Sequence, residues 1–426
     1  MFAVLKESEP GTRTRLGFLG APWPVSAPGE SHRPRPRWDA LVPRVRDMTP
    51  SPSDVHVLLV SAQAAPNLLP TLDPELRPRE AVLVVSGKMK ARADDLERVL
   101  REAGVGTSRV AVDNEHDLQS LEKAFLEIAE SRAAQRIALN VTGGTKLMAL
   151  AAQQIAGAAD WDVFYVDVDT DEAIPLDKTK PHRQLKPALG LSHYLQAYGY
   201  RKEGNPVQQP IEPRVNDLLS TLVLQVGSLE KPLGQLNWLA DRAESRGRLE
   251  SRMSPEQLDS LSLGALIRNF EDAGLVMLEG DTLRFTSEAA RAFVKGGWLE
   301  RHVFRRVAAL AGELGIRDKA SNLVLVDAGG VKNELDVIFI ARNRLFVIEC
   351  KTARMDGDRA GKANDALFKL SEVCRRVGGL GTRAMLASYR RLSEAERRLA
   401  HALGIELACG SELAQLDDRL RKWIGG

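Results

Sequence analysis

The sequence predicts an α/β protein in three parts: a doubly wound domain with a parallel sheet, a helical part with a small hairpin, and a second α/β domain. Short apolar runs alternate with amphipathic segments from residue 54 to residue 201, and the alternation resumes after residue 295. Strands that are apolar on both faces are typical of parallel sheets covered by helices. A chain of 426 residues is long enough for two or three such domains.

The first domain, residues 54–201, consists of repeated β-α units. Its predicted strands are 55–60, 81–86, 108–113, 136–141 and 162–168. Its predicted helices are 93–104, 117–131 and a third that begins after the Gly-rich turn "TGGTK". Ligands of such folds bind beyond the carboxyl ends of the strands, so the turns at those ends are the first candidates for a site.

Residues 202–294 are predicted to be a linker and a winged-helix-like region. The stretch "KEGNPVQQPIEPR" at 202–214 is Pro-rich, as linkers are. Helical patterns follow, and the last runs into two short strands around Gly280-Asp281. Helices before a small hairpin are typical of a winged helix. A plain connector between domains is the alternative, because no cluster of Arg and Lys marks a recognition helix.

The first 53 residues are predicted to be a disordered extension. They are rich in Pro and Arg, as in "APWPVSAPGESHRPRPRW", and show no apolar periodicity. They contain no apolar segment of the kind that secretory signals have. Met48 would serve as an alternative start, so residues 1–47 are interpreted as a flexible tail or an over-long gene prediction.

The composition restricts the class of protein. A formal net charge of +2 argues against a histone-like partner, although local basic patches remain compatible with a nuclease. No run of eighteen apolar residues is present, so we expect no membrane span. Cys350, Cys374 and Cys409 form no CxxC pair, which favours the reducing cytoplasm over a disulfide framework or a zinc ribbon.

The third part, residues 295–426, contains charged residues inside apolar runs. A helix over 295–315 is predicted first, and the elements predicted after it are strands 334–341 and 344–350, helix 365–379, strand 382–388 and helix 393–404. The two adjacent strands, "ELDVIFIA" and "RLFVIECK", include Asp336, Glu349 and Lys351. Acids and a lysine in the core of a sheet need a chemical reason.

The spacing of these residues predicts one convergent site. If Arg342-Asn343 is a two-residue turn, Asp336 lies opposite Glu349, with Cβ atoms about 4.5–5.5 Å apart. Glu349 and Lys351 are two apart on one strand and share a face, whereas Cys350 points to the other face.

Two carboxylates at this separation repel one another unless a cation lies between them. Oxygen ligands suit Mg²⁺ or Mn²⁺, which can acidify a water molecule and stabilise charge on a phosphate. Lys351 would then hold the water or the developing charge. A salt-bridged acid pair at a sheet edge is the alternative, but it does not explain why all three residues share a face.

Asp336, followed one strand later by Glu349-x-Lys351, resembles the signature of the PD-(D/E)xK nucleases, which implies a restriction-endonuclease-like fold. Glu300 matches the acid that this fold often has on its first helix, and Glu334 is a second acid on the face of Asp336. Leu335 stands where the family name has proline, a position that is often lax. The resemblance also implies a helix packed after the motif, from which Lys369 could reach a phosphate.

Three polar turns follow strands of the first domain and predict a phosphate-bearing, nucleotide-like ligand. Backbone N–H groups at a helix N-terminus favour anions, and "NVTGGTKLMAL" places two glycines where a strand meets a helix. The pattern is neither a P-loop nor GxGxxG. Ordinary turns of a doubly wound fold are the alternative. The candidate ligand-binding residues are Ser61, Gln63, Asn67, Ser86, Gly87, Lys88, Met89, Asn140, Thr142, Gly143, Gly144, Thr145 and Lys146.

These turns resemble a Rossmann-like CARF domain, the cyclic-oligoadenylate sensor of type III CRISPR systems. The order of "TGGTK", "NELDV" and "IECK" is similar to that in CRISPR ancillary nucleases activated by cyclic tetra-adenylate, over residues 54–426. The resemblance implies a homodimer that binds the ring across two CARF domains and cuts DNA, RNA or both. It also implies a divalent metal, often Mn²⁺, held by Asp336, Glu349 and the Cys350 carbonyl.

Two other functions remain open at this point. One is a constitutive restriction- or repair-type nuclease whose first domain binds a partner. The other is a ligand-responsive transcription regulator built from a sensor and a winged helix. The set Asp336, Glu349 and Lys351 counts against the regulator, because a pure regulator has no use for these residues.

Overall fold

The computed structural model describes residues 53–204, 213–352 and 362–426, and the predicted extension lies almost entirely outside them. The first sheet has seven strands in the order β3-β2-β1-β4-β5-β6-β7. Strands β1 to β5 are parallel, whereas β6 and β7 are antiparallel. The strand bounds are β1 (Val55–Leu59), β2 (Glu80–Ser86), β3 (Gly106–Val112), β4 (Ile137–Asn140), β5 (Asp162–Asp167), β6 (Glu172–Pro175) and β7 (Arg183–Gln184).

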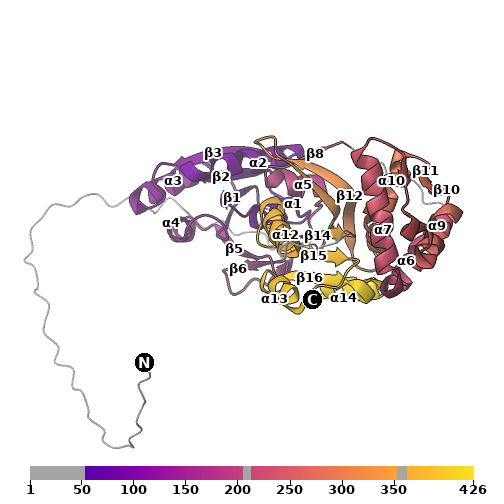
Figure 1. The fold of residues 1–426 in the computed structure, drawn as a ribbon. Helices are drawn as coiled ribbons and strands as arrows, with labels where there is room; N and C mark the ends of the chain where they lie inside the picture. The colour runs from indigo at the N-terminus through magenta and orange to yellow at the C-terminus, as the bar shows by residue number, and fades with distance from the viewer. Residues whose placement is uncertain (1–52, 205–212, 353–361) are drawn as a thin grey trace, which may run out of the picture. The chain divides into compact units, whose positions relative to one another are not determined.

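Helices connect the parallel strands, as the sequence predicts, and Figure 1 shows them around the indigo and purple sheet. The helices are α1 (Ala65–Leu72), α2 (Lys90–Glu102), α3 (Leu118–Ser131), α4 (Lys146–Ala158) and α5 (Leu191–Ala197), with a 3₁₀ turn η2 (Gly87–Met89) before α2. The buried strand residues divide between two clusters that include helix residues, so the sheet is packed on both faces. Strand order reverses at β1, which lies between β2 and β4, and such a reversal is where ligands bind in open α/β sheets.

The middle part contains a winged-helix-like arrangement. Helices α6 (Pro213–Leu224), α7 (Val226–Ser245), α8 (Pro255–Leu258) and α9 (Leu261–Asp272) precede a hairpin of β10 (Val276–Glu279) and β11 (Thr282–Phe285). The hairpin turns at Gly280, whose φ of 61° is left-handed. A third strand, β9 (Glu250–Arg252), completes the sheet in the order β10-β11-β9, and the sequence pattern did not predict it.

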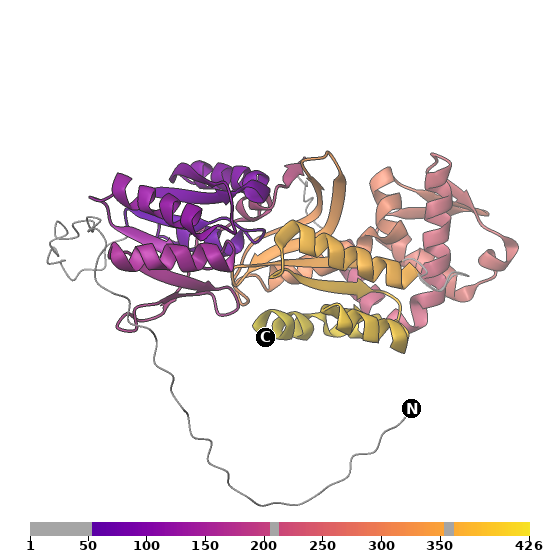
Figure 2. The ribbon, with the colours of Figure 1, turned by 90° about the vertical axis from the view of Figure 1, so that its left-hand side faces the viewer.

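The last part is built on a six-stranded sheet in the order β16-β15-β14-β13-β12-β8. After α10 (Glu288–Ala292) and a short turn η3 (Phe293–Gly297), its helices are α11 (Trp298–Ala309), α12 (Lys362–Gly378), α13 (Glu394–Ala402) and, after the 3₁₀ turn η4 (Gly410–Gln415), α14 (Leu416–Gly425). The strands are β12 (Ile316–Val326), β13 (Lys332–Ala341), β14 (Arg344–Lys351), β15 (Arg383–Ser388) and β16 (Ile405–Cys409). Figure 2 shows this sheet, in orange and yellow, from the side.

One strand of this sheet comes from the end of the first part of the chain. Strand β8 (Arg201–Glu203) pairs antiparallel with β12 at the edge of the last sheet. The predicted domain boundary after residue 201 therefore falls inside a strand that belongs to the last sheet. The pairing gives the chain a backbone connection between its two α/β parts.

The central hairpin has the predicted register. Val337 pairs with Ile348 and Ala341 pairs with Arg344, around a two-residue turn at Arg342-Asn343. Both turn residues are left-handed, with φ of 46° and 54°, as a type I′ turn requires. The predicted position of Asp336 opposite Glu349 follows from this register.

The two faces of the last sheet pack against different helices. Ile338, Ile340, Leu345 and Val347 belong to the core cluster that contains α12 side chains and also residues of the first sheet. Cys350 belongs to the other cluster, with side chains of α11 and α14, so its predicted position in the core is confirmed. Alternation therefore places Glu349 and Lys351 on the α12 side. No helix among the described residues is both long and apolar enough to cross a membrane.

Candidate active site and sensor turns

The acids of the central hairpin lie where β13 begins and β14 ends. Asp336 Oδ2 accepts a hydrogen bond from the backbone N–H of Cys350, at 2.6 Å. Glu349 Oε1 lies 2.5 Å from Lys351 Nζ. The structure therefore brings the three predicted residues Asp336, Glu349 and Lys351 together at one end of the hairpin.

Burial and neighbouring charge set the protonation of this group. Burial, with a further contribution from the Glu349 charge, raises the pKa of Asp336 to about 7, and the hydrogen bond from the Cys350 N–H opposes both. Burial lowers the pKa of Lys351, but the attraction of Glu349 outweighs it, so the pKa is raised and the ammonium stays charged. The site thus combines Asp336, which loses its proton less readily than an ordinary aspartate, with Lys351, which stays protonated.

Glu300 joins the group from α11. Its Oε2 accepts a hydrogen bond from Asn322 Nδ2 at 3.0 Å, and Asn322 lies on β12 with a left-handed φ of 51°. Burial raises the pKa of Glu300, the Asn322 bond opposes this, and the charge of Glu334 adds to the rise. Glu334 is exposed on β13, at the outer side of the site. Sequence reasoning did not single out Asn322, whose role depends on a strand that was not predicted.

The donor set is compatible with a hard divalent cation. Among the described residues, no group of three or more His, Cys, Asp or Glu side chains is arranged to hold a metal ion. The carboxylates of Asp336 and Glu349 nevertheless lie close enough at this end of the hairpin for the Glu349 charge to raise the pKa of Asp336, and oxygen donors of this type suit Mg²⁺ or Mn²⁺. The pKa of Asp336 is raised mainly by burial and then by the charge of Glu349.

A second basic candidate for this site, Lys369, lies exposed on α12. Helix α12 packs on β14 and β15, as the prediction required, and its Cys374 is close enough to Glu349 that this charge contributes to the raised pKa of Cys374, whose main cause is burial. No hydrogen bond or ion pair joins Lys369 to another described residue, so its predicted phosphate contact stays a prediction.

The three predicted polar turns of the first domain are adjacent. They follow β1, β2 and β4, and β1 pairs in parallel with both of the other strands. Their carboxyl ends therefore meet at one edge of the sheet, beside the reversal of strand order. This adjacency is what a shared ligand site requires.

Three of the predicted ligand-binding residues form a buried network. Asn140 Nδ2 donates to Asn67 Oδ1 at 3.0 Å, and Asn67 Nδ2 donates to the Leu59 carbonyl at 2.9 Å. Asn140 Oδ1 accepts from the Thr142 hydroxyl at 2.6 Å, and that hydroxyl accepts from the Val166 N–H at 2.7 Å. Because Asn67 and Asn140 are fully buried, we expect them to position the turns rather than to contact a ligand.

The "TGGTK" turn has a geometry that requires its glycines. A Cβ on Gly143 would lie 2.0 Å from the Leu59 carbonyl oxygen, and Gly144 is left-handed with φ of 69°. Thr145 caps α4 by accepting from the Met148 N–H at 3.2 Å. Lys146 opens the helix and is exposed, so it is free to meet an anion.

The other two turns are partly occupied by the protein itself. Lys88 forms an exposed ion pair with Glu115 at 3.0 Å, and Met89 packs against the core. Ser86 is buried and Gly87 is exposed with open space around it. Ser61 bonds within its own turn, to the Gln63 carbonyl at 3.1 Å.

Gln63 contacts the last part of the chain, as do several groups that the sequence did not indicate. Its Oε1 accepts from the Leu380 N–H at 3.0 Å, between α12 and β15. Asn343, in the turn of the central hairpin, donates to the Leu185 carbonyl at 3.2 Å. Asp318 Oδ2 accepts from the Leu191 N–H at 2.8 Å. These contacts join residues far apart in sequence, so no local pattern predicts them.

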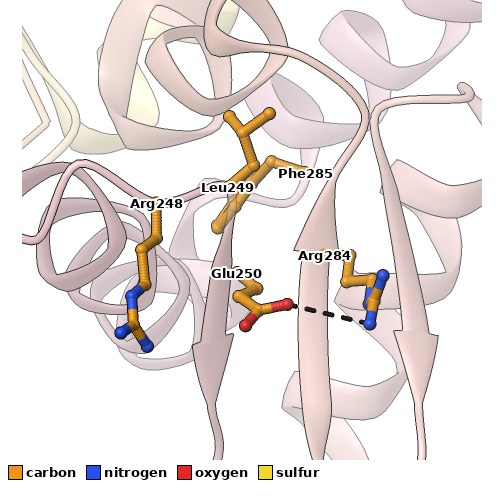
Figure 3. A pocket seen from close by; sticks show the side chains of 5 residues that line it. All are labelled: Arg248, Leu249, Glu250, Arg284 and Phe285. Atoms are coloured by element: carbon orange, nitrogen blue, oxygen red, sulfur yellow. Dashed lines mark ion pairs between the residues drawn. The ribbon is translucent and has the colours of Figure 1, made fainter.

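Two cavities of the described residues are lined by side chains other than the acids of the hairpin. One, of about 430 Å³, is in the winged-helix-like part, where Arg248 and Arg284 flank Glu250 (Figure 3). Arg284 and Glu250 form an ion pair at 3.8 Å. A second, of about 410 Å³, includes Asp171 and Arg344 among its lining residues.

Fold and site together define a nuclease domain joined to a ligand-sensing domain. Comparison with known proteins agrees: residues 55–194 match the Card1 CARF domain, and residues 287–425 match the Card1-like endonuclease domain. The chain therefore belongs to the family of CRISPR ancillary nucleases that combine a CARF domain with an endonuclease domain. No curated protein is similar enough to count as a match.

Solved structures resemble the chain over most of its length. Protein VC1899 from Vibrio cholerae is 26% identical, with a TM-score of 0.79, over 87% of this chain and 98% of the other. Can2 from Sulfobacillus thermosulfidooxidans, in complex with cyclic tetra-adenylate, is 25% identical with a TM-score of 0.72, over 88% and 98%. A type III CRISPR defence DNA nuclease activated by cyclic oligoadenylate shares the fold at 19% identity and a TM-score of 0.51, over 80% of this chain and 46% of that one.

Proposed function

We propose that the chain is a metal-dependent nuclease of type III CRISPR defence that cyclic oligoadenylate, most simply cyclic tetra-adenylate, switches on. The observation that carries the proposal is the convergence of Asp336, Glu349 and Lys351 at one end of a hairpin whose turn contacts the CARF domain. Can2, a structure similar to this chain, was determined with cyclic tetra-adenylate bound. The same ring is thus the first ligand to test here.

The chain's own groups suggest their roles in phosphodiester hydrolysis. The Cys350 N–H orients the Asp336 carboxylate, and Lys351 orients that of Glu349. A bound Mg²⁺ or Mn²⁺, held by these two carboxylates and the Cys350 carbonyl, would supply an acidified water and charge for the phosphate. Lys351, which stays protonated, stabilises the negative charge that develops on the phosphate.

Glu300 and Glu334 complete the acidic surroundings. Asn322 holds Glu300 toward the site, and the exposed Glu334 is placed to bind through water. We assign both to positioning of the metal and its water.

For the sensor, we propose that Lys146, Thr145 and the backbone of Gly143-Gly144 face the ring phosphates at the start of α4. The amide groups that open the helix attract anions, and Lys146 adds a charge. Ser61, Gln63, Ser86, Gly87, Lys88 and Met89 border the same edge. A ring with twofold symmetry fits a homodimer, because an isologous dimer presents the same surface twice.

The test is cleavage of labelled single-stranded DNA, single-stranded RNA and supercoiled plasmid with Mn²⁺ or Mg²⁺, with and without the ring. We expect cutting or nicking that needs both the metal and cyclic tetra-adenylate. Equal cutting without the ring would instead identify a constitutive nuclease. Duplex binding without any cutting would identify a transcription regulator.

A further inference from the structure

Helix α7 presents three faces, and the third bears exposed and half-buried side chains whose one hydrogen bond to another element, among the described residues, runs from Arg242 to the Arg252 carbonyl, at 3.2 Å. Its apolar face, including Leu233, Leu236 and Leu239, is buried in the core that the winged-helix-like part shares with the last sheet. Because a helix turns by 100° per residue, positions 230, 234, 237 and 241 form a second face. This second face contacts the last domain.

The contacts of the second face lie at the carboxyl ends of β14 and β15. Asn237 Nδ2 donates to the carbonyl of Thr352, the residue after Lys351, at 3.3 Å. Glu230 forms an ion pair with Arg390 at 3.4 Å, just after β15. Asp241 pairs with Lys295 at 2.8 Å. The helix therefore runs beside the end of the strand that bears Glu349 and Lys351.

The third face is basic and aromatic. Lys231, Gln235, Trp238 and Arg242 follow one another at helical spacing, about 100° around from the second face. Trp238 is 51% exposed, and the Arg242 guanidinium carbon lies 5.2 Å from the centre of its ring. Lys231 has no ion-pair partner among the described residues, and none of these four positions is acidic. We call this set the α7 stripe.

We propose that the α7 stripe binds single-stranded nucleic acid on its way to the nuclease site, with one base stacked on Trp238 and the phosphates near Lys231 and Arg242. This inference rests on the proposed nuclease function and identifies a surface, away from the acids, that holds the substrate. An exposed aromatic ring between cationic side chains is how proteins hold unpaired strands. A duplex keeps its base faces inside the stack, so only an unpaired base can reach the indole.

A protein partner is less consistent with these side chains. The stripe has a single large apolar group, and its neighbours are charged or polar. A docking surface for another protein needs a contiguous apolar patch with several anchors. Asn237, on the adjacent face of the same helix, donates to Thr352, and this contact rather than hydrophobicity relates the α7 stripe to the nuclease site.

Binding of fluorescein-labelled oligothymidylate to the full chain, without added metal so that nothing is cut, tests the proposal. We expect Trp238→Ala to weaken binding roughly tenfold, and Trp238→Phe to restore most of it, because a phenyl ring still stacks. Oligothymidylate should quench tryptophan fluorescence less in Trp238→Phe than in the unaltered protein. Leu261→Ala is the matched control, since Leu261 is 89% exposed on α9 and lies outside the stripe.

Cleavage kinetics separate this inference from the proposed function. Where the unaltered chain cuts, Trp238→Ala should raise KM and leave kcat nearly unchanged, because Trp238 binds substrate away from the reacting phosphate. Equal oligothymidylate affinity in the unaltered protein and in Trp238→Ala overturns the inference, while cutting by both upholds the nuclease. If the unaltered chain binds oligothymidylate through Trp238 but cuts no substrate, nucleic-acid binding by the α7 stripe is supported and the proposed nuclease function is refuted.

Discussion

Glu349 is a charged residue in a largely apolar strand, and the geometry of the hairpin explains why an acid stands there. It lies on the sheet face that packs toward α12, paired with Lys351 at 2.5 Å and opposite Asp336. A salt bridge alone would leave Asp336 without a cation, and burial together with Glu349 raises the pKa of Asp336 to about 7. A metal site remains our proposal for why two acids and one lysine share this face.

Glu349→Gln should lower cleavage by roughly 100-fold or more, because the amide cannot replace the carboxylate as a metal ligand or hold Lys351 as an ion pair. Initial rates on labelled single-stranded DNA and RNA with Mn²⁺ and the ring measure the effect. Glu372→Gln is the matched control, since Glu372 is an exposed acid on α12 that pairs with Arg375 at 2.9 Å. Unchanged activity in Glu349→Gln would refute the site.

A second effect at the scale of single residues concerns His56, the second residue of β1. The side chain is 1% exposed, and burial lowers its pKa to about 4. Between pH 6.5 and about 4, the unfolded chain binds a proton that the folded chain does not. The free energy of unfolding therefore falls as the pH falls through this window.

Between pH 7 and pH 4.5, His56→Leu should remove about 2 kcal/mol of this pH dependence, which is most of the effect of a shift of about 2.5 pKa units. Urea unfolding at pH 7 and at pH 4.5 measures the difference between variant and unaltered protein. His302, whose pKa burial also lowers to about 4, keeps a similar dependence in both proteins. The exposed His401→Gln should leave the dependence unchanged, and an equal slope in His56→Leu would contradict the expectation.

At the scale of elements, the turn between β4 and α4 depends on close packing. Gly143 approaches the end of β1 so closely that a methyl group would overlap the Leu59 carbonyl oxygen, at 2.0 Å. The Asn67–Asn140 pair fixes the same strand ends from within. The predicted anion site is therefore a rigid turn on a buried polar support.

Gly143→Ala should destabilise the chain by more than about 2 kcal/mol, because backbone has to move to admit the methyl group. Gly157→Ala is the matched control: Gly157 lies in α4 with nothing within 4 Å of its added Cβ. The control should be neutral or stabilising by up to about 1 kcal/mol. Urea unfolding compares them, and equal effects would show that the close approach is not needed.

The sequence predicted helices and strands correctly where a short run of neighbouring residues determines them. The parallel strands of the first sheet, the hairpin around Gly280 and the register around Arg342-Asn343 follow from apolar runs and turn residues. Strand β12 was missed because its first half, "IRDKAS", has the charged pattern of a surface segment. Helix α1 begins at Ala65, inside the expected polar turn, and so takes Asn67 into the core.

At the scale of the whole molecule, the catalytic hairpin spans the distance between site and sensor. Its open end bears Asp336 and Glu349, and its turn contacts the CARF domain through Asn343. Asn343 is 3% exposed, and it accepts from Arg317 at 2.6 Å while donating to the Leu185 carbonyl at 3.2 Å. A stiff two-stranded element of this kind can transmit a displacement of the sensor to the acids.

Asn343→Ala should reduce activation by the ring roughly 5- to 100-fold, the usual range of coupling between two sites, while the ring binds nearly as before. The ratio of cleavage rates with and without cyclic tetra-adenylate measures coupling, and calorimetry measures ring affinity. Arg383→Ala is the control, since Arg383 is exposed at the start of β15. An unchanged ratio in Asn343→Ala would show that the hairpin turn does not transmit the signal.

The sequence alone determined the order of domains, the parallel sheet with its adjacent polar turns, and the register that opposes Asp336 to Glu349. Each depends on spacing along one or two neighbouring elements, and short-range geometry specifies it. Only the tertiary structure decided that Asn67 and Asn140 are buried, that β8 completes the last sheet, and that Asn343 meets the CARF domain. Those outcomes depend on contacts between residues far apart in the chain, which no local pattern encodes.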